Sequence, residues 1–331
     1  MSNASPSEVA PHVSPPGGPA PAAPAPGVAG ALRRVRQILE MIRFSHTLFA
    51  LPFAFLSAEM AWRLSADESA GNASLAREAL GILLAMVTAR SAAMAFNRVA
   101  DWRIDAANPR TAGRHIPQGT LSVTAVAAFA AASAVAFVAS TLLFLPNVLP
   151  LVLSGPVLAF LLGYSWTKRF TSLAHFWLGA SLMLAPVAAW IALRGEQVLA
   201  RPADLLPALT LGGAVLLWTA GFDMIYACQD AAFDHQAGLH SIPARWGVAG
   251  ALRLAAACHA GMIALLALLP RVYPAFGNVY WGAVVAVALL LVYEHSLVRP
   301  KDLARVNRAF FHVNAVVSLG LWALGTIDLF F

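Results

Sequence analysis

The sequence predicts an all-α membrane protein that crosses the bilayer about nine times. Of its 331 residues, 59% are hydrophobic and only 11% are charged, with a mean hydropathy of +0.69. An ordinary soluble domain carries about 25% charged residues. The apolar residues also occur in stretches of helix length, and none alternates with the period of two that a membrane barrel requires. We therefore expect a polytopic helical bundle.

Nine stretches reach the roughly 20 mostly apolar residues that a membrane helix needs. They cover 45–64, 79–98, 122–144, 147–166, 173–193, 206–228, 248–268, 277–296 and 309–329. Sixteen Lys and Arg residues fall in or beside one alternate set of connections, and five fall in the other set. Because basic loops stay in the cytoplasm, this asymmetry predicts a cytoplasmic N-terminus and supports the number of spans.

The chain divides into an N-terminal tail and one transmembrane domain. Residues 1–35 are rich in Pro, Ala and Gly and have no periodic apolar face, so we expect a disordered tail that is not a signal peptide. Residues 36–331 form the membrane domain. The basic residues are scattered over several loops, which argues against nucleic-acid binding. The two cysteines predict neither a disulfide framework nor a CxxC metal site.

Two acidic motifs stand at the ends of the predicted second and sixth spans. In "NRVADWRID", Asn97, Asp101 and Asp105 are four residues apart and so share one helix face. In "DMIYACQDAAFD", Asp223, Asp230 and Asp234 are spaced by seven and four, which also predicts one helical stripe.

Ionisable groups at membrane depth are expensive and usually functional. Mg²⁺ is typically held by one or two carboxylates together with waters and substrate phosphates. Two such clusters facing each other could hold two ions and bridge a diphosphate. Solvated helix ends, or carboxylates paired with nearby arginines, are the alternative interpretation.

Basic side chains accompany both motifs on the same side of the membrane. Arg110 and Arg114 follow the first motif in a Gly- and Pro-containing loop, and Lys168 and Arg169 follow the predicted fourth span. Guanidinium and ammonium groups are the expected partners of phosphate oxygens. The positive-inside rule is the alternative explanation for each of them.

These motifs resemble those of the UbiA superfamily of intramembrane aromatic prenyltransferases. "NRVADWRID" resembles the family's NDxxDxxxD motif, "DMIYACQDAAFD" its DxxYxxxDxxxD motif, and "YSWTKRFT" its Tyr-x-x-x-Lys-Arg stretch. The opening "RFSHTLFALPFAF" is similar to the family's first helix, so the resemblance covers nearly everything from about residue 35 onward. One departure is Arg98, which stands where the family often has an aspartate.

The resemblance implies nine transmembrane helices around a central cavity with cytoplasmic cap loops. It also implies a polyprenyl diphosphate held through Mg²⁺ by both motifs. On this basis the candidate metal ligands are Asn97, Asp101, Asp105, Asp230 and Asp234. Asn97 together with Arg110, Arg114, Lys168 and Arg169 would bind the diphosphate substrate. Asp223 would support the second cluster or act as the base, Tyr164 would face the carbocation, and Arg43 would bind the acceptor's carboxylate.

The implied reaction is the transfer of a polyprenyl group to a hydroxylated aromatic acid in quinone biosynthesis. The partners would be a polyprenyl diphosphate, the aromatic acceptor and the lipid bilayer, in the inner (cytoplasmic) membrane. 4-Hydroxybenzoate is the favoured acceptor, and a hydroxynaphthoate of menaquinone synthesis is the alternative. A transporter or lipid flippase is the alternative of another class. It is disfavoured because the acidic residues stand at span ends and not in broken helices at mid-membrane.

Overall fold

The computed structural model describes residues 36–42, 49–65, 72–300, 302–303 and 305–331, with only the backbone of Asn72 and of residues 308–310. Within these ranges the regular secondary structure is helical, apart from one isolated bridge between Arg299 and Asp302, and turns and short loops join the helices. The predicted tail and Arg43 lie outside the described residues. The expected all-α architecture is confirmed.

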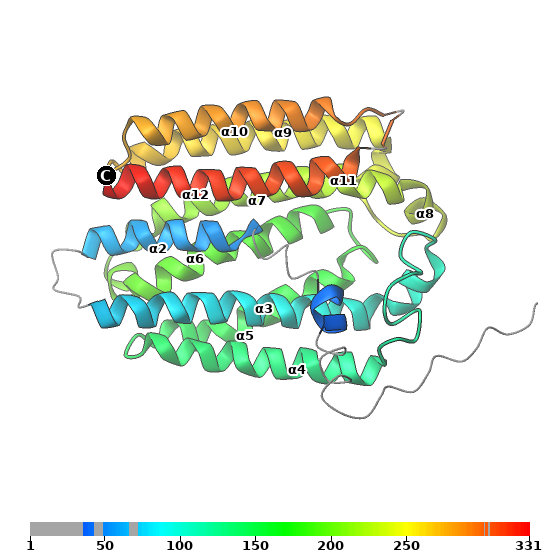
Figure 1. Ribbon diagram of the computed structural model, residues 1–331, viewed down its shortest axis with the longest axis horizontal. Coiled ribbons are helices and arrows are strands. Elements are labelled where there is room, and N and C mark those ends of the chain that lie inside the picture. The colour runs from blue at the N-terminus through cyan, green and yellow to red at the C-terminus, as the bar shows by residue number, and fades with distance from the viewer. Residues whose placement is uncertain (1–35, 43–48, 66–71, 301, 304) are drawn as a thin grey trace, which may run out of the picture.

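Among the described residues, nine long helices form the bundle and run side by side along its length (Figure 1). They are α2 (Leu51–Ser65), α3 (Asn72–Ala107), α4 (Val123–Ser140), α5 (Leu149–Thr167), α6 (Ala174–Ala200), α7 (Leu206–Ala227), α9 (Ile242–Val272), α10 (Asn278–Ser296) and α12 (Asn314–Phe330). In the described part of the chain, eight segments are long and apolar enough to cross a membrane. The first predicted span corresponds to α2, whose described part has 15 residues. The chain is thus a multi-pass membrane protein.

Short elements join or interrupt these helices. They are η2 (Thr141–Phe144), η3 (Pro202–Leu205), η4 (Cys228–Asp230), α8 (Ala231–Gln236), α11 (Val306–Arg308) and the π-helical η5 (Ala309–Val313). Ser122 and Ser241 cap the first turns of α4 and α9, where each hydroxyl accepts a hydrogen bond from a backbone N–H. Gly247 bends α9 near its start with a φ of +70°, a backbone conformation that residues other than glycine rarely adopt.

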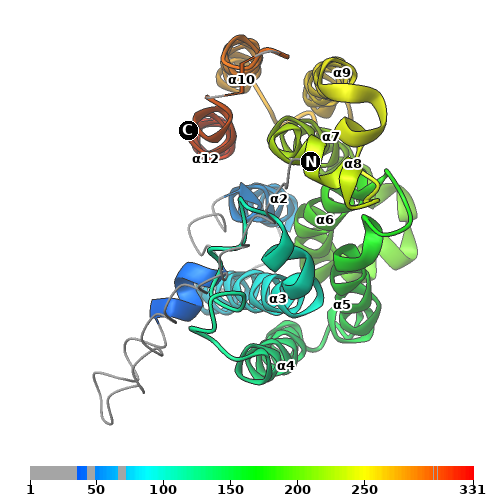
Figure 2. The same ribbon diagram turned by 90° about the vertical axis from the view of Figure 1, so that its right-hand side faces the viewer.

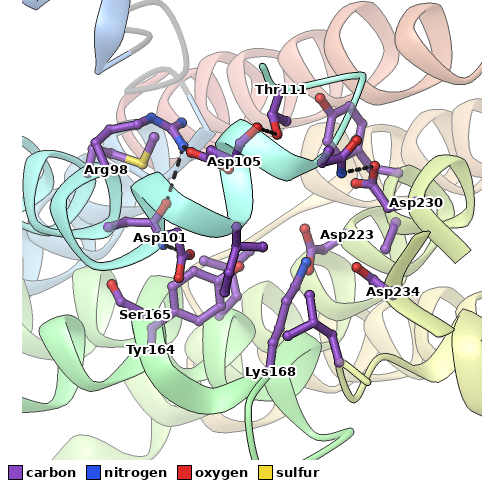
Figure 3. A pocket seen from close by; sticks show the side chains of 18 of the residues that line it. Arg98, Asp101, Asp105, Thr111, Tyr164, Ser165, Lys168, Asp223, Asp230 and Asp234 are labelled. Atoms are coloured by element: carbon purple, nitrogen blue, oxygen red, sulfur yellow. Dashed lines mark hydrogen bonds and ion pairs between the residues drawn. The ribbon is translucent and has the colours of Figure 1, made fainter. Parts of the chain in front are cut away.

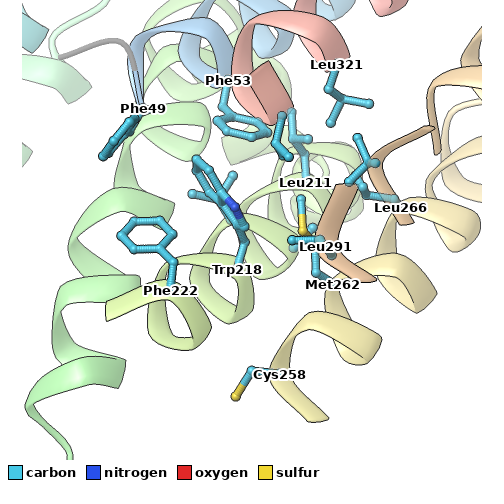
Figure 4. Close-up of a cluster of buried hydrophobic side chains, with 14 of the residues drawn as sticks. Phe49, Phe53, Leu211, Trp218, Phe222, Cys258, Met262, Leu266, Leu291 and Leu321 are labelled. Atoms are coloured by element: carbon cyan, nitrogen blue, oxygen red, sulfur yellow. The ribbon is translucent and has the colours of Figure 1, made fainter. Parts of the chain in front are cut away.

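The helix α7 lies inside the bundle, with α2, α6 and α9 around it when the bundle is viewed end-on (Figure 2). Its Trp218 is fully buried and packs against Phe49, Phe53 and Phe222, with ring centroids 4.9–6.2 Å apart (Figure 4). Aromatic pairs at these separations add to the stabilisation from burial alone. This packing holds α7 in place, and α7 leads directly into the second acidic motif.

The two acidic motifs meet at one end of the bundle, which we call the motif end. The segment that follows α3 and the short helix α8 lie together there, as Figure 1 and Figure 2 both show. The helix α3 continues through Asp105 to Ala107 before its chain turns back. The fold therefore brings together two motifs that are more than a hundred residues apart in the sequence.

Candidate active site

A cavity of about 240 Å³ opens between α3, α5, α6 and α7 at the motif end (Figure 3). Eleven of the twelve predicted site residues line it, and Arg43, the twelfth, lies outside the described residues. The eleven are Asn97, Asp101, Asp105, Arg110, Arg114, Tyr164, Lys168, Arg169, Asp223, Asp230 and Asp234. The cavity wall is thus far more charged than the rest of the membrane domain.

The first motif has the predicted helical geometry, because α3 runs through it without a break. Asn97 Nδ2 donates to Asp101 Oδ2 over 2.9 Å, and Arg169 Nη2 lies 3.1 Å from Asp101 Oδ1. Asp105 Oδ1 accepts a 2.6 Å hydrogen bond from Arg114 Nη1. Each carboxylate of this motif therefore has an arginine as its counter-charge.

The second motif differs from the predicted single stripe, because the helix does not continue through it. The helix α7 ends at Ala227, and the 3₁₀ turn η4 carries Asp230 before α8 begins. Asp223, Asp230 and Asp234 nevertheless all line the cavity. The break changes their relative directions, so the second cluster is built by a turn and two helices.

Asp230 joins the second motif to the loop that follows the first. Both Arg110 Nε, at 2.7 Å, and Arg110 Nη2 donate to its carboxylate. Asn108 Nδ2 adds a third hydrogen bond of 3.1 Å. Burial lowers the pKa of Arg110, but its bonds to Asp230 and Tyr226 outweigh this effect and the pKa is raised overall. Arg110 is therefore cationic. Its bonds to Asp230 attach the loop that follows α3 to η4 at the cavity.

Asp223 has a different kind of partner. Its Oδ2 lies 2.7 Å from Nδ1 of His175, a side chain on α6 with no exposed surface. Figure 3 shows Lys168 extending from the end of α5 toward Asp223. Nothing in the sequence marks His175 as a partner of Asp223, because it lies 48 residues away and has no motif around it.

The carboxylate oxygens that line the cavity suit a Mg²⁺ ion that also binds a phosphate ligand. Oδ2 of Asp105 and Oδ2 of Asp234 are buried and have no hydrogen-bond partner among the described residues. No group of three or more His, Cys, Asp or Glu residues in the described part of the chain could by itself hold a metal ion. Because Mg²⁺ usually keeps only one or two carboxylates and takes its other ligands from water and phosphates, these separate oxygens suit it.

Sequence reasoning missed several residues of the cavity wall. They are Phe49, Arg90, Met94, Ile104, Asn108, Thr111, Ser165, Leu178, Leu182, Phe222, Tyr226, Ala227, Phe233 and Leu239. A signal existed for Arg90, which precedes Asn97 by seven residues and so lies on the same face of α3. No comparable signal existed for Leu178 or Leu182, whose place depends on how α6 packs. Arg98, the departure from the family motif, also lines the cavity, and its Nη1 lies 3.8 Å from Oδ2 of Asp105.

Fold and cavity together define a multi-pass membrane protein with an acid- and arginine-lined site at one end of its bundle. The sequence model of the UbiA prenyltransferase family matches residues 48–316. The chain belongs to this family and is an aromatic prenyltransferase.

Named relatives and solved structures agree with this assignment. The chain is 29% identical to 4-hydroxybenzoate octaprenyltransferase of Vibrio parahaemolyticus over 72% of its length and 81% of that protein. It is 32% identical to the protein of that name from Nitrosospira multiformis, over 71% and 77%. A UbiA homolog from Aeropyrum pernix K1 has a TM-score of 0.74 and 33% identity, with 85% of this chain and 97% of that chain covered. A UbiA homolog from Archaeoglobus fulgidus, solved with DMAPP and Mg²⁺, has the same fold with a TM-score of 0.63 and 17% identity, over 88% and 99%.

Proposed function

We propose that this protein transfers a polyprenyl group from a polyprenyl diphosphate to 4-hydroxybenzoate with the help of Mg²⁺. The observation that carries the proposal is the meeting of both acidic motifs and their arginines around one cavity. The names of its relatives support this acceptor, and the Mg²⁺ in a structure of the same fold supports the metal. The enzyme would work in the inner membrane with its N-terminus and motif end in the cytoplasm.

The residues of the motif end would bind the diphosphate. Asn97, Asp101, Asp105, Asp230 and Asp234 would hold Mg²⁺, which when bound neutralises charge on the leaving diphosphate. Lys168, Arg110, Arg114 and Arg169 would contact the phosphate oxygens directly, because cationic donors stabilise developing negative charge.

The remaining steps would use the inner part of the cavity. Breaking the allylic C–O bond leaves a delocalised cation on the prenyl group, and Tyr164 would face it with its ring. The surrounding helices would exclude water, which would otherwise capture that cation. The ring carbon of the acceptor then attacks, and Asp223 would accept the ring proton so that aromaticity is restored.

A prenylation assay with the purified protein tests the proposal. We expect a long-chain polyprenyl diphosphate and 4-hydroxybenzoate to give prenylated acid with Mg²⁺ and none with excess EDTA. Mg²⁺-dependent product from a dihydroxynaphthoate alone would keep the reaction and move the acceptor to menaquinone synthesis. No product from either acceptor, together with no binding of the diphosphate, would refute the proposal.

The role of Asp223 can be separated from that of the metal ligands. We expect Asp223→Asn to lower kcat roughly 10²-fold or more, because a positioned base contributes about 10²–10⁴-fold. The KM for the polyprenyl diphosphate should stay unchanged, since the amide can still accept the hydrogen bond from His175. A raised KM for the diphosphate with an unchanged kcat would instead assign Asp223 to the second metal cluster.

A further inference from the structure

His175 is a fully buried histidine that contacts one carboxylate of the cavity wall. It is the second residue of α6, its side chain has no exposed surface, and it does not itself line the cavity. Its Nδ1 lies 2.7 Å from Oδ2 of Asp223, which does line the cavity. Its Nε2 is buried and has no hydrogen-bond partner among the described residues. Because burying a polar ring is costly unless the ring is hydrogen-bonded, the contact with Asp223 is what keeps an imidazole acceptable here.

The hydrogen bond between the two side chains has one chemically reasonable direction. A carboxylate offers only acceptors, so Nδ1 of His175 must carry the proton and donate it to Asp223. A doubly protonated ring would also bury an Nε2–H that has no acceptor in the described part of the chain, and a neutral ring avoids this cost. The neutral Nδ1–H tautomer follows from these two conditions. His175 therefore donates one hydrogen bond without neutralising the charge of Asp223.

Asp223 thus differs from the acidic residues of the cavity that pair with arginine. Within the described ranges no arginine forms an ion pair with Asp223, and His175 is its counter-group. An arginine would neutralise a carboxylate and occupy its oxygens with a fork of donors. A single neutral donor holds Oδ2 and leaves Oδ1 available to accept a proton. The carboxylates that pair with arginine are Asp101, Asp105 and Asp230.

The close packing of α6 against α7 holds this pair in place. A Cβ added at Gly179, one helical turn after His175, would collide with the backbone oxygen of Leu216 on α7. The two backbones are therefore already in contact near the pair, and neither helix can move toward the other. A base must lie within hydrogen-bond reach of the proton that it removes, so a rigid support of this kind favours the reaction.

We propose that His175 is a positioning residue that holds Asp223 in the orientation in which this carboxylate removes the ring proton. The inference rests on the proposed function and adds the group through which Asp223 becomes effective. After the prenyl carbon has bonded to the ring, the attacked ring carbon still carries its hydrogen. That C–H bond breaks, its electron pair restores aromaticity, and the proton passes to Oδ1 of Asp223 while Oδ2 keeps its bond from His175. The proton then leaves to water at the motif end.

The test compares His175→Met with His175→Gln, because the two side chains have similar length and volume and only glutamine has an N–H donor. We expect His175→Met to lower kcat roughly 10- to 100-fold, the usual loss when a group that orients another is removed. The KM values for 4-hydroxybenzoate and for the polyprenyl diphosphate should not change. His175→Gln should retain most of the wild-type kcat, because its amide can donate to Asp223.

Two further readouts separate positioning from a structural role. The first uses an acceptor deuterated at the ring carbons beside the hydroxyl. We expect a larger deuterium isotope effect with His175→Met than with the wild type, because proton removal becomes the slow step. The second is the double variant of His175→Met with Asp223→Asn. It should be no slower than Asp223→Asn alone, because the base that His175 positions is already absent.

The matched control is His312→Met, the same substitution at a histidine of η5 that is exposed and does not line the cavity. We expect it to have the kcat and the isotope effect of the wild type. Melting temperatures in detergent identify any variant that fails to fold. If His175→Met fails, the ¹⁵N NMR spectrum of histidine-labelled wild type decides, with the His175 signals identified by their absence from His175→Gln. A proton on Nδ1 supports the proposal, and a proton on Nε2 refutes it.

Three results would overturn the proposal while leaving prenyl transfer intact. They are a wild-type kcat in His175→Met, equal losses of kcat in His175→Met and His175→Gln, and a double variant much slower than Asp223→Asn. Equal losses would mean that the imidazole only fills space between α6 and α7. A wild type that forms no product refutes the proposed function instead, and the assignment of Asp223 and His175 falls with it.

Discussion

Replacing Asp234 with asparagine is expected to reduce prenyl transfer roughly 10³-fold, because it removes an anionic oxygen that would hold Mg²⁺. The carboxylate is only 3% exposed, and its Oδ2 has no hydrogen-bond partner among the described residues. Asparagine has nearly the same volume, so the packing around α8 should persist. The loss should therefore appear in catalysis and not in folding.

The measurement is kcat as a function of Mg²⁺ concentration, with the melting temperature in detergent as the folding check. We expect Asp234→Asn to need more Mg²⁺ and to remain slow at saturation. Glu196→Gln is the matched control, because Glu196 is an exposed acidic residue of α6 that does not line the cavity. An Asp234→Asn variant with wild-type turnover and Mg²⁺ dependence would remove Asp234 from the ligand set.

Replacing Gly179 with valine is expected to have the largest effect on stability. A Cβ at this position of α6 would collide with the backbone carbonyl oxygen of Leu216 on α7. Backbone atoms cannot rotate away, so the two helices would have to separate. Overpacking of this kind costs about 1–3 kcal/mol and occasionally more. The substitution also lies one helical turn from His175, whose 2.7 Å contact with Asp223 depends on the same helix pair.

Thermal unfolding in detergent measures this effect, and Gly179→Ala should give a smaller shift in the same direction. Gly155→Val is the matched control, because a Cβ added at Gly155 on α5 meets nothing within 4 Å. We expect its melting temperature to stay close to that of the wild type. Equal melting temperatures for Gly179→Val and Gly155→Val would show that α6 and α7 can separate at no cost.

The first acidic motif was predictable in detail and the second was not. The spacing of Asn97, Asp101 and Asp105 fixed a common face because α3 continues through all of them. The same reasoning failed at Asp230, where η4 interrupts the helix with backbone angles φ −101° and ψ 0°. No proline or glycine marks this break, so local propensity gives no warning. In this turn the carboxylate of Asp230 accepts hydrogen bonds from Arg110 and Asn108, which belong to a loop that is distant in the sequence.

The sequence by itself determined the membrane helices, their approximate limits and the residue types of the site. The length of an apolar stretch and the residues that share a helix face depend only on neighbours along the chain. Because unpaired backbone groups are costly in lipid, such a stretch forms a membrane helix. Only the tertiary structure decided which arginine neutralises which carboxylate, that His175 contacts Asp223, and that Arg90 lines the cavity. These facts depend on contacts between helices that lie far apart in the sequence, such as the approach of α6 to α7 at Gly179. No periodicity along one helix records the position of another.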